Sequence, residues 1–100
     1  MAERRGFQRI PIITPVNIST VERRDRIGMI RDVSADGMLF HSRSRFAIGE
    51  RVSVYFDVDA NRHDISGRVV RASLDTNHDT LFQHLTAIRF EAPLATPLSS

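Results

Sequence analysis

The sequence of 100 residues contains no cysteine, no tryptophan and no lysine. Without cysteine the chain forms no disulfide and no thiolate metal site, so its fold must rest on a single hydrophobic core. No apolar run approaches the roughly 18 residues of a membrane-spanning helix, and no apolar segment of a signal peptide follows the N-terminus. We therefore expect one cytoplasmic domain that does not insert into a membrane.

All fourteen basic residues are arginines, and they are unevenly distributed. Residues 1–31 hold seven arginines against three acids, a local charge of +4, whereas residues 32–100 hold seven against nine acids, a local charge of −2. The stretch ERRGFQRIP places Arg4, Arg5 and Arg9 around one aromatic residue before any apolar periodicity begins. A guanidinium carries a permanent charge and five donors that a small core cannot satisfy. This N-terminal end is therefore expected to bind an anion.

The apolar pattern predicts strands and no long helix. Residues 51–59 show this best, because valine and phenylalanine alternate with polar residues and so place one face inward and one in water. Further strands are expected at residues 10–19, 27–34, 38–42, 64–73 and 84–92. The first resembles an edge strand broken near Pro15, and Asp36-Gly37 is expected to form the tight turn between the second and third.

Six short strands with turn residues between them describe a small antiparallel sandwich or barrel, and closure into a barrel would remove the exposed sheet edges. The chain then divides into a flexible arginine arm at residues 1–9, a barrel at residues 10–92 and a frayed tail at residues 93–100. Pro93 and Pro97 oppose a long helix in that tail. Little or no C-terminal helix is expected.

The first candidate binding motif is the pair Arg5 and Arg9, preceded by Arg4. In an extended chain, residues four apart project to the same side about 13 Å from each other, so they can hold opposite ends of one ligand. A guanidinium binds phosphate or guanine through two hydrogen bonds and stacks on bases. A solvated terminal arm would show the same pattern, and this alternative stays open.

The second candidate motif is Asp32, Ser34 and Gly37. Asp32 and Ser34 lie two residues apart in a strand and so face the same side, where the carboxylate can accept from the N1–H and N2–H₂ edge of a guanine. Gly37 is expected to have positive φ in the turn and to let a ligand approach the backbone. The alternative is an ordinary hairpin turn in which both side chains bond to nearby amides.

Taken together, the two motifs resemble those of the PilZ domain, a bacterial receptor module for cyclic di-GMP. That family pairs an R-x-x-x-R arm with a [D/N]-x-S-x-x-G turn some 20 to 30 residues later, and both occur here in that order. RIPI, FAIGERVSVYFDV, ISGRVVRAS and AIRFEAPL are similar to the segments that follow in the family. Ala87 departs from the family, which often has glycine there.

The resemblance implies a small six-stranded antiparallel barrel whose arm wraps cyclic di-GMP against the barrel. Arg5 and Arg9 would take phosphates and guanine faces. The turn of Asp32, Ser34 and Gly37 would hold a guanine.

Two further arginines enter through the resemblance. Arg4 extends the arm to R-R-x-x-x-R, which is similar to members that bind an intercalated dimer of the ligand. Arg71, at the end of the predicted fifth strand, is a further candidate for lining the ligand site, although an exposed strand arginine would look the same.

Two other functions are compatible with parts of the sequence. One is an adaptor of PilZ-like fold that binds a protein and no nucleotide, acting in motility or pilus assembly. The other is a barrel that binds single-stranded nucleic acid through arginines and aromatics, which the single tyrosine and the acidic barrel oppose, so neither DNA nor RNA is expected as a partner. A downstream protein partner is expected.

Catalytic and metal chemistry find little support in the sequence. His41, His63, His78 and His84 form no helical i, i+4 pair, and no phosphate-binding loop or nucleophile elbow occurs. A calcium loop beginning at Asp57 fails because arginine stands where the pattern requires glycine and glutamate. The protein is therefore not expected to be an enzyme, and cyclic di-GMP is expected as a ligand and not a cofactor.

Overall fold

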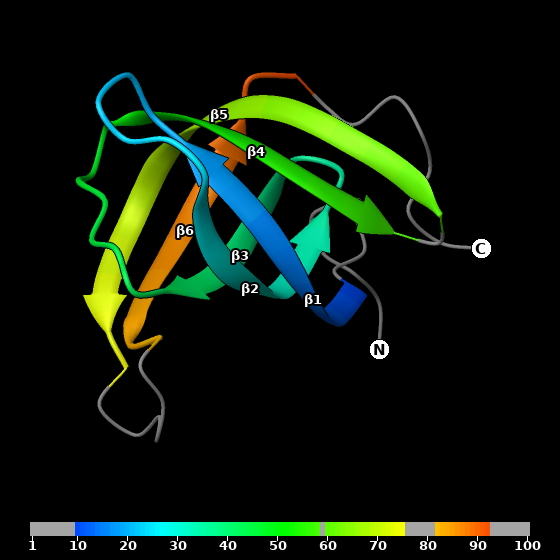
Figure 1. The fold of residues 1–100 in the computed structure, drawn as a ribbon, viewed down its shortest axis with the longest axis horizontal. Coiled ribbons are helices and arrows are strands. Elements are labelled where there is room, and N and C mark those ends of the chain that lie inside the picture. Colours follow the sequence, from blue (N-terminus) through cyan, green and yellow to red (C-terminus); the bar gives the residue numbers. More distant parts are fainter. Residues whose placement is uncertain (1–9, 59, 76–81, 93–100) are drawn as a thin grey trace.

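The structure, a computed structural model, describes residues 10–58, 60–75 and 82–92 and is a closed antiparallel barrel (Figure 1). Its strands are β1 (Ile10–Ser19), β2 (Arg26–Ser34), β3 (Gly37–Ser42), β4 (Arg51–Val58), β5 (Asn61–Leu74) and β6 (His84–Phe90). Their order around the barrel is β1-β2-β3-β6-β5-β4. The described residues form no helix, and so none long and apolar enough to cross a membrane. The prediction of an all-β, six-stranded antiparallel barrel is confirmed.

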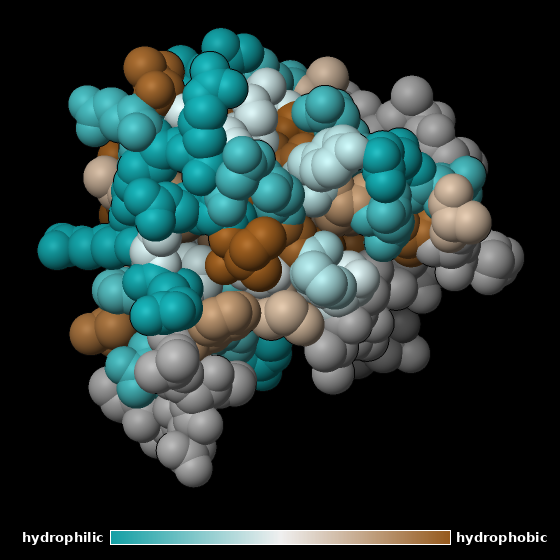
Figure 2. Space-filling view, in the orientation of Figure 1, coloured by the Kyte–Doolittle hydropathy of each residue, from teal (hydrophilic) through white to brown (hydrophobic). Residues whose placement is uncertain are grey.

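Alternation along the strands builds the core. In β4, Val52, Val54 and Phe56 are buried and the residues between them are exposed. Phe46, from the loop before β4, is fully buried at one end of the barrel, where its ring meets Phe40 edge to face at 6.0 Å. The surface seen in Figure 2 is largely hydrophilic, with hydrophobic residues in separate areas.

The expectation that the first strand is an edge strand broken near Pro15 is wrong about the break, and it holds for the edge only before Asn17. β1 runs without a break and pairs with β2 along most of its length and with β4 at Asn17–Ser19. Its irregularity lies between Pro11 and Thr14 instead. Pro15 is tolerated because β4 does not pair with this part of β1, so its missing N–H costs no hydrogen bond on that side.

Two turns also differ from expectation. Ser34 pairs with Gly37, so the turn residues between β2 and β3 are Ala35 and Asp36, and Gly37 already belongs to β3. β5 begins at Asn61, three residues earlier than predicted, because the turn before it is short. The sequence therefore predicts that a turn occurs in both places, but the observed turns are displaced from the predicted ones by one residue or more.

Candidate functional site

The candidate site lies on the outer wall of the barrel, where a β-bulge in β2 places Asp32. The register between β2 and β3 shifts between Ile30 and Asp32, so that Ile30 and Val33 both point into the core. In a regular strand Asp32 would share the buried face of Ile30. The bulge turns it outward, where it is half-buried on the same face as Ser34.

A second bulge, in β5, does the same for Arg71. The register between β5 and β6 shifts between Val69 and Arg71, and Val69 is buried whereas Arg71 is exposed. Arg71 pairs with Ala87, Ala87 with Leu39, and Leu39 with Asp32. The two bulges therefore place Asp32 and Arg71 at the two ends of one row across four strands, roughly 14 Å apart at a strand spacing of about 4.8 Å.

The neighbouring row contains three arginines in register. Ser34 pairs with Gly37, Gly37 with Arg89, Arg89 with Arg68, and Arg68 with Arg51. Like charges directly opposite each other destabilise a sheet. The three arginines form a row of positive charge on the outer wall, and this row begins beside the turn at Ser34.

The arginines of this row differ in what they bind. Arg51 makes two hydrogen bonds to Glu91, with Nε–Oε2 at 2.7 Å and Nη2–Oε1 at 3.1 Å. Arg68 donates to the carbonyl of Gly49 at 3.0 Å. Arg89 has no hydrogen bond or ion pair with any residue that the structure describes. Arg89 is therefore the guanidinium of this row that is most available to an anion.

The ion pair of Arg51 with Glu91 predicts a measurable acid titration. Hydrogen bonds from Arg51 lower the pKa of the Glu91 carboxyl below its ordinary value of 4.5, and the charges of Arg51 and Arg68 act in the same direction. Stability from this group is therefore present above pH 4.5 and is lost as the pH falls through the lowered pKa. We expect Arg51→Gln to raise the Glu91 pKa toward 4.5 in a carboxyl NMR titration; an unchanged value would contradict the pairing.

The turn between β2 and β3 is held from two sides. The buried hydroxyl of Ser34 donates to Oδ1 of Asp36 at 2.6 Å, and the amide of Phe90 donates to the carbonyl of Asp36 at 2.8 Å. The proton of the Ser34 hydroxyl is therefore used within the turn, and its oxygen can only accept from a ligand. Asp36, which the sequence predicted only as a turn residue, also ties this turn to the end of β6.

Gly37 serves a different purpose from the one expected. It does not have positive φ. A Cβ at this position would lie 2.5 Å from the carbonyl oxygen of Ile88 in β6, so glycine is needed for the close approach of two strands. On the outer wall it lies in the row between Ser34 and Arg89, beside the row that joins Asp32 to Arg71.

Not all predicted site residues can be placed. Asp32, Ser34, Gly37 and Arg71 come together on the outer wall, and Arg89 and Arg68, which sequence reasoning missed, join them. Arg4, Arg5 and Arg9 lie outside the described residues. The alternation in the strand AIRF could have predicted that Arg89 points outward. That it lies next to Gly37 and Arg68 follows only from the register of three strands.

The histidines belong to other parts of the molecule. Nε2 of His41 lies 2.9 Å from Oδ2 of Asp75, and the ring of His63 stacks on Phe56 at 5.1 Å. Within residues 10–58, 60–75 and 82–92, no group of three or more histidine, aspartate or glutamate side chains could hold a metal ion.

Comparison with known proteins gives both a family and a fold. Residues 3–96 match the PilZ domain family. The structure is similar to that of the Bacillus subtilis inhibitor of motility MotI/DgrA, with a TM-score of 0.74 and 16% identity over 94% of this chain and 46% of that one. It is also similar to the PilZ domain of YcgR from Escherichia coli, solved with c-di-GMP, with a TM-score of 0.58 and 16% identity over 89% of this chain and 79% of that one.

The lengths of these chains differ. The chain spans about half the length of the MotI/DgrA chain. Comparison with curated protein sequences gave no match.

Proposed function

The chain belongs to the PilZ domain family, and from this premise we propose that it is a signalling module that binds cyclic di-GMP on its outer wall. In this proposal the N-terminal arginine arm closes over the barrel when the ligand binds, and the change is relayed to a partner protein. The observation that carries the proposal is the row that sets Asp32 against Arg71, with the uncharged residues Leu39 and Ala87 between them. The protein acts by binding and not by catalysis.

The chemistry of the ligand matches the two sides of this wall. A guanine edge offers N1–H and N2–H₂ donors, which the Asp32 carboxylate can accept, and the Ser34 oxygen can accept a further hydrogen bond. The phosphates need cations, which Arg71 and Arg89 supply from the wall. Gly37, in the neighbouring row, leaves the wall beside Ser34 without a side chain, so that a planar base can approach there.

The arm supplies the rest of the site in this proposal. Arg5 and Arg9 take the phosphates and the guanine faces from the side opposite the wall, and Arg4 adds a contact to a second ligand molecule stacked on the first. Because an arm of like charges repels itself, its closure depends on the bound anion. Ligand concentration then sets the population of the closed state.

The test is the thermal stability of the domain with and without ligand. At a ligand concentration of about 100 times Kd, binding stabilises the folded state by about 2.7 kcal/mol, which raises Tm by roughly 10–20 °C for a domain of this size. Asp32→Ala should lose most of this rise relative to its own ligand-free Tm. A full rise in Asp32→Ala would remove the carboxylate from the site.

Arg89 provides a separate prediction, because its side chain has no partner among the described residues. We expect Arg89→Gln to weaken binding of cyclic di-GMP about three- to tenfold and to reduce its dependence on salt. Arg24→Gln is the matched control. Arg24 is also exposed, but it lies just before the start of β2, whereas the site lies at the other end of this strand, at Ser34. Equal losses in the two variants would indicate an effect of net charge alone.

The second candidate function is an adaptor of the same fold that binds a protein without nucleotide. It shares the barrel but does not need Asp32 or the arginines. A domain that shows no stabilisation by cyclic di-GMP and still binds a partner would be such an adaptor.

A further inference from the structure

A strand edge lies at the other end of β6 from the turn at Ser34, and it shares only Arg71 with the proposed ligand site. β5 pairs with β6 as far as Leu74, but its pairing with β4 ends at Arg68. One residue further, Val69 exchanges two backbone hydrogen bonds with the loop before β4. Beyond it, residues 70–74 have no strand on that side within the described part of the chain. This edge of β5 is open.

The open edge presents backbone hydrogen-bonding groups at two residues. The amide of Asp75 donates to the carbonyl of Gln83 on the β6 side at 2.8 Å. Successive residues of an antiparallel ladder alternate between bonding to the partner strand and pointing away from it. By this alternation Ala72 and Leu74 direct their N–H and C=O groups away from β6. Such unpaired groups are a template on which an additional strand forms.

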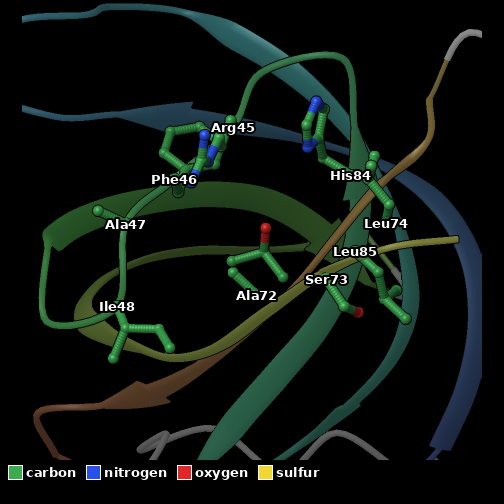
Figure 3. Close-up of a pocket in the computed structure, with 10 residues that line it drawn as sticks. Arg45, Phe46, Ala47, Ile48, Ala72, Ser73, Leu74, His84 and Leu85 are labelled. Carbon is green, nitrogen blue, oxygen red and sulfur yellow. The ribbon is translucent and has the colours of Figure 1, made fainter.

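A pocket of about 530 Å³ adjoins this edge (Figure 3). The loop residues 45–48 line one side of it, and Leu74, His84 and Leu85 line the other. Ile48 is 69% exposed and Leu74 is 58% exposed, and Val70 on the same strand is 49% exposed. Three of the six large apolar side chains exposed on the described surface therefore gather at one edge.

A buried polar group also lines the pocket. Thr86 pairs with Ala72 in the ladder and is 1% exposed, and its hydroxyl has no hydrogen-bond partner among the residues that the structure describes. A buried hydroxyl without a partner is costly, so a group that enters the pocket and bonds to it would gain from doing so.

The carboxylates near the edge are engaged within the chain, whereas two of its arginines have no such partner among the described residues; Oδ2 of Asp75, for example, lies 2.9 Å from Nε2 of His41. Arg45 lines the pocket, and neither Arg45 nor Arg71 has an ion pair with a described residue. The nearby carboxylate of Glu50 lies 3.6 Å from the guanidinium of Arg23 and also accepts from the amide of Ala47, so it is already engaged. An acidic occupant is favoured over a basic one.

We infer that this edge is the docking site of an extended segment of a partner protein, in which apolar residues alternate with acidic ones. Ala72 and Leu74 share the face of Thr86, so apolar side chains of an added strand meet the pocket. Arg71 lies on the opposite, outer face, where the acidic side chains would lie. A second copy of this chain is the alternative occupant, and the oligomeric state of the chain tests it.

The test uses the full chain and a fluorescein-labelled peptide, Glu-Val-Glu-Val-Glu-Val-Glu, with its Lys-Val counterpart as the charge control. We expect fluorescence anisotropy to show at least tenfold tighter binding of the acidic peptide. Ala72→Pro removes an outward N–H without breaking a bond to β6, and it should weaken this binding at least tenfold. Equal affinity for the two peptides, or unchanged binding to Ala72→Pro, would overturn the inference.

Two further measurements keep the test independent of folding and of self-association. Leu74→Asp should weaken peptide binding at least tenfold, whereas Val21→Asp, at a valine that is 97% exposed elsewhere, should leave it unchanged. Equal effects of these two variants on peptide binding would overturn the inference that this edge is the docking site. Sedimentation of the chain alone should give a monomer; a dimer that Ala72→Pro dissociates would assign the edge to a second copy instead.

Discussion

Arg9→Ala is expected to lower the affinity for cyclic di-GMP at least 100-fold while the barrel unfolds at the wild-type temperature. Two or more charge-assisted hydrogen bonds to phosphate, each of about 1.5–3 kcal/mol, are lost with one guanidinium. The core is built from residues of the strands and of the loop before β4, and Arg9 precedes the first strand. Isothermal titration measures the loss, and thermal unfolding measures the fold.

The matched variants of this experiment are Arg5→Ala and Arg24→Ala. Arg5→Ala should behave as Arg9→Ala does, because the proposal assigns both arginines to one ligand. Arg24→Ala removes the same charge from an exposed position before β2 and should bind normally. Unchanged affinity in both arm variants would remove the arm from the mechanism.

Gly37→Ala is expected to destabilise the domain by about 2–3 kcal/mol, in the upper part of the range for overpacked sites. Its Cβ would lie 2.5 Å from the carbonyl oxygen of Ile88, and a backbone atom cannot move aside without disturbing the ladder between β3 and β6. The measurement is chemical denaturation of both proteins without ligand. Binding should weaken as well, because the strands that carry Asp32 and Arg89 would shift.

Gly49→Ala is the control for Gly37→Ala. Gly49 has a φ of +91°, but nothing lies within 4 Å of the position its Cβ would take. Its replacement costs only backbone strain, about 1 kcal/mol. If Gly49→Ala destabilised the domain more than Gly37→Ala, the close approach between β3 and β6 would not be the reason for glycine at position 37.

The strands could be read from the sequence because most of them expose one face to water. The alternation of Val52, Val54 and Phe56 with polar residues identifies β4 directly. β1 could not be understood in this way, because its proline suggests an edge and the sequence does not show that β4 pairs only with its last residues. Whether a strand has one neighbour or two depends on closure of the whole barrel.

The composition of the site was predictable, but its geometry was not. Spacing alone correctly placed Asp32 and Ser34 on one face, yet it did not reveal that a bulge is needed to turn that face outward. The same holds for Arg71, which would point into the core without the bulge after Val69. Bulges arise from the pairing of distant strands, so a local sequence pattern does not predict them.

The row of arginines illustrates the same limit. Arg51, Arg68 and Arg89 are far apart in sequence and become neighbours only through the registers of β4 with β5 and of β5 with β6. The balance of acids and bases over residues 32–100 is negative, which hides this positive row. Charge on a β-barrel has to be counted by face and not by segment.

The central claim is tested most directly by isothermal titration of cyclic di-GMP into the chain at about 150 mM salt, with GTP and linear pGpG as controls. The account predicts saturable binding of cyclic di-GMP, much weaker binding of both controls, and a stoichiometry near two if Arg4 helps to hold a ligand dimer. No heat and no thermal stabilisation with cyclic di-GMP, or equal binding of all three nucleotides, would contradict it.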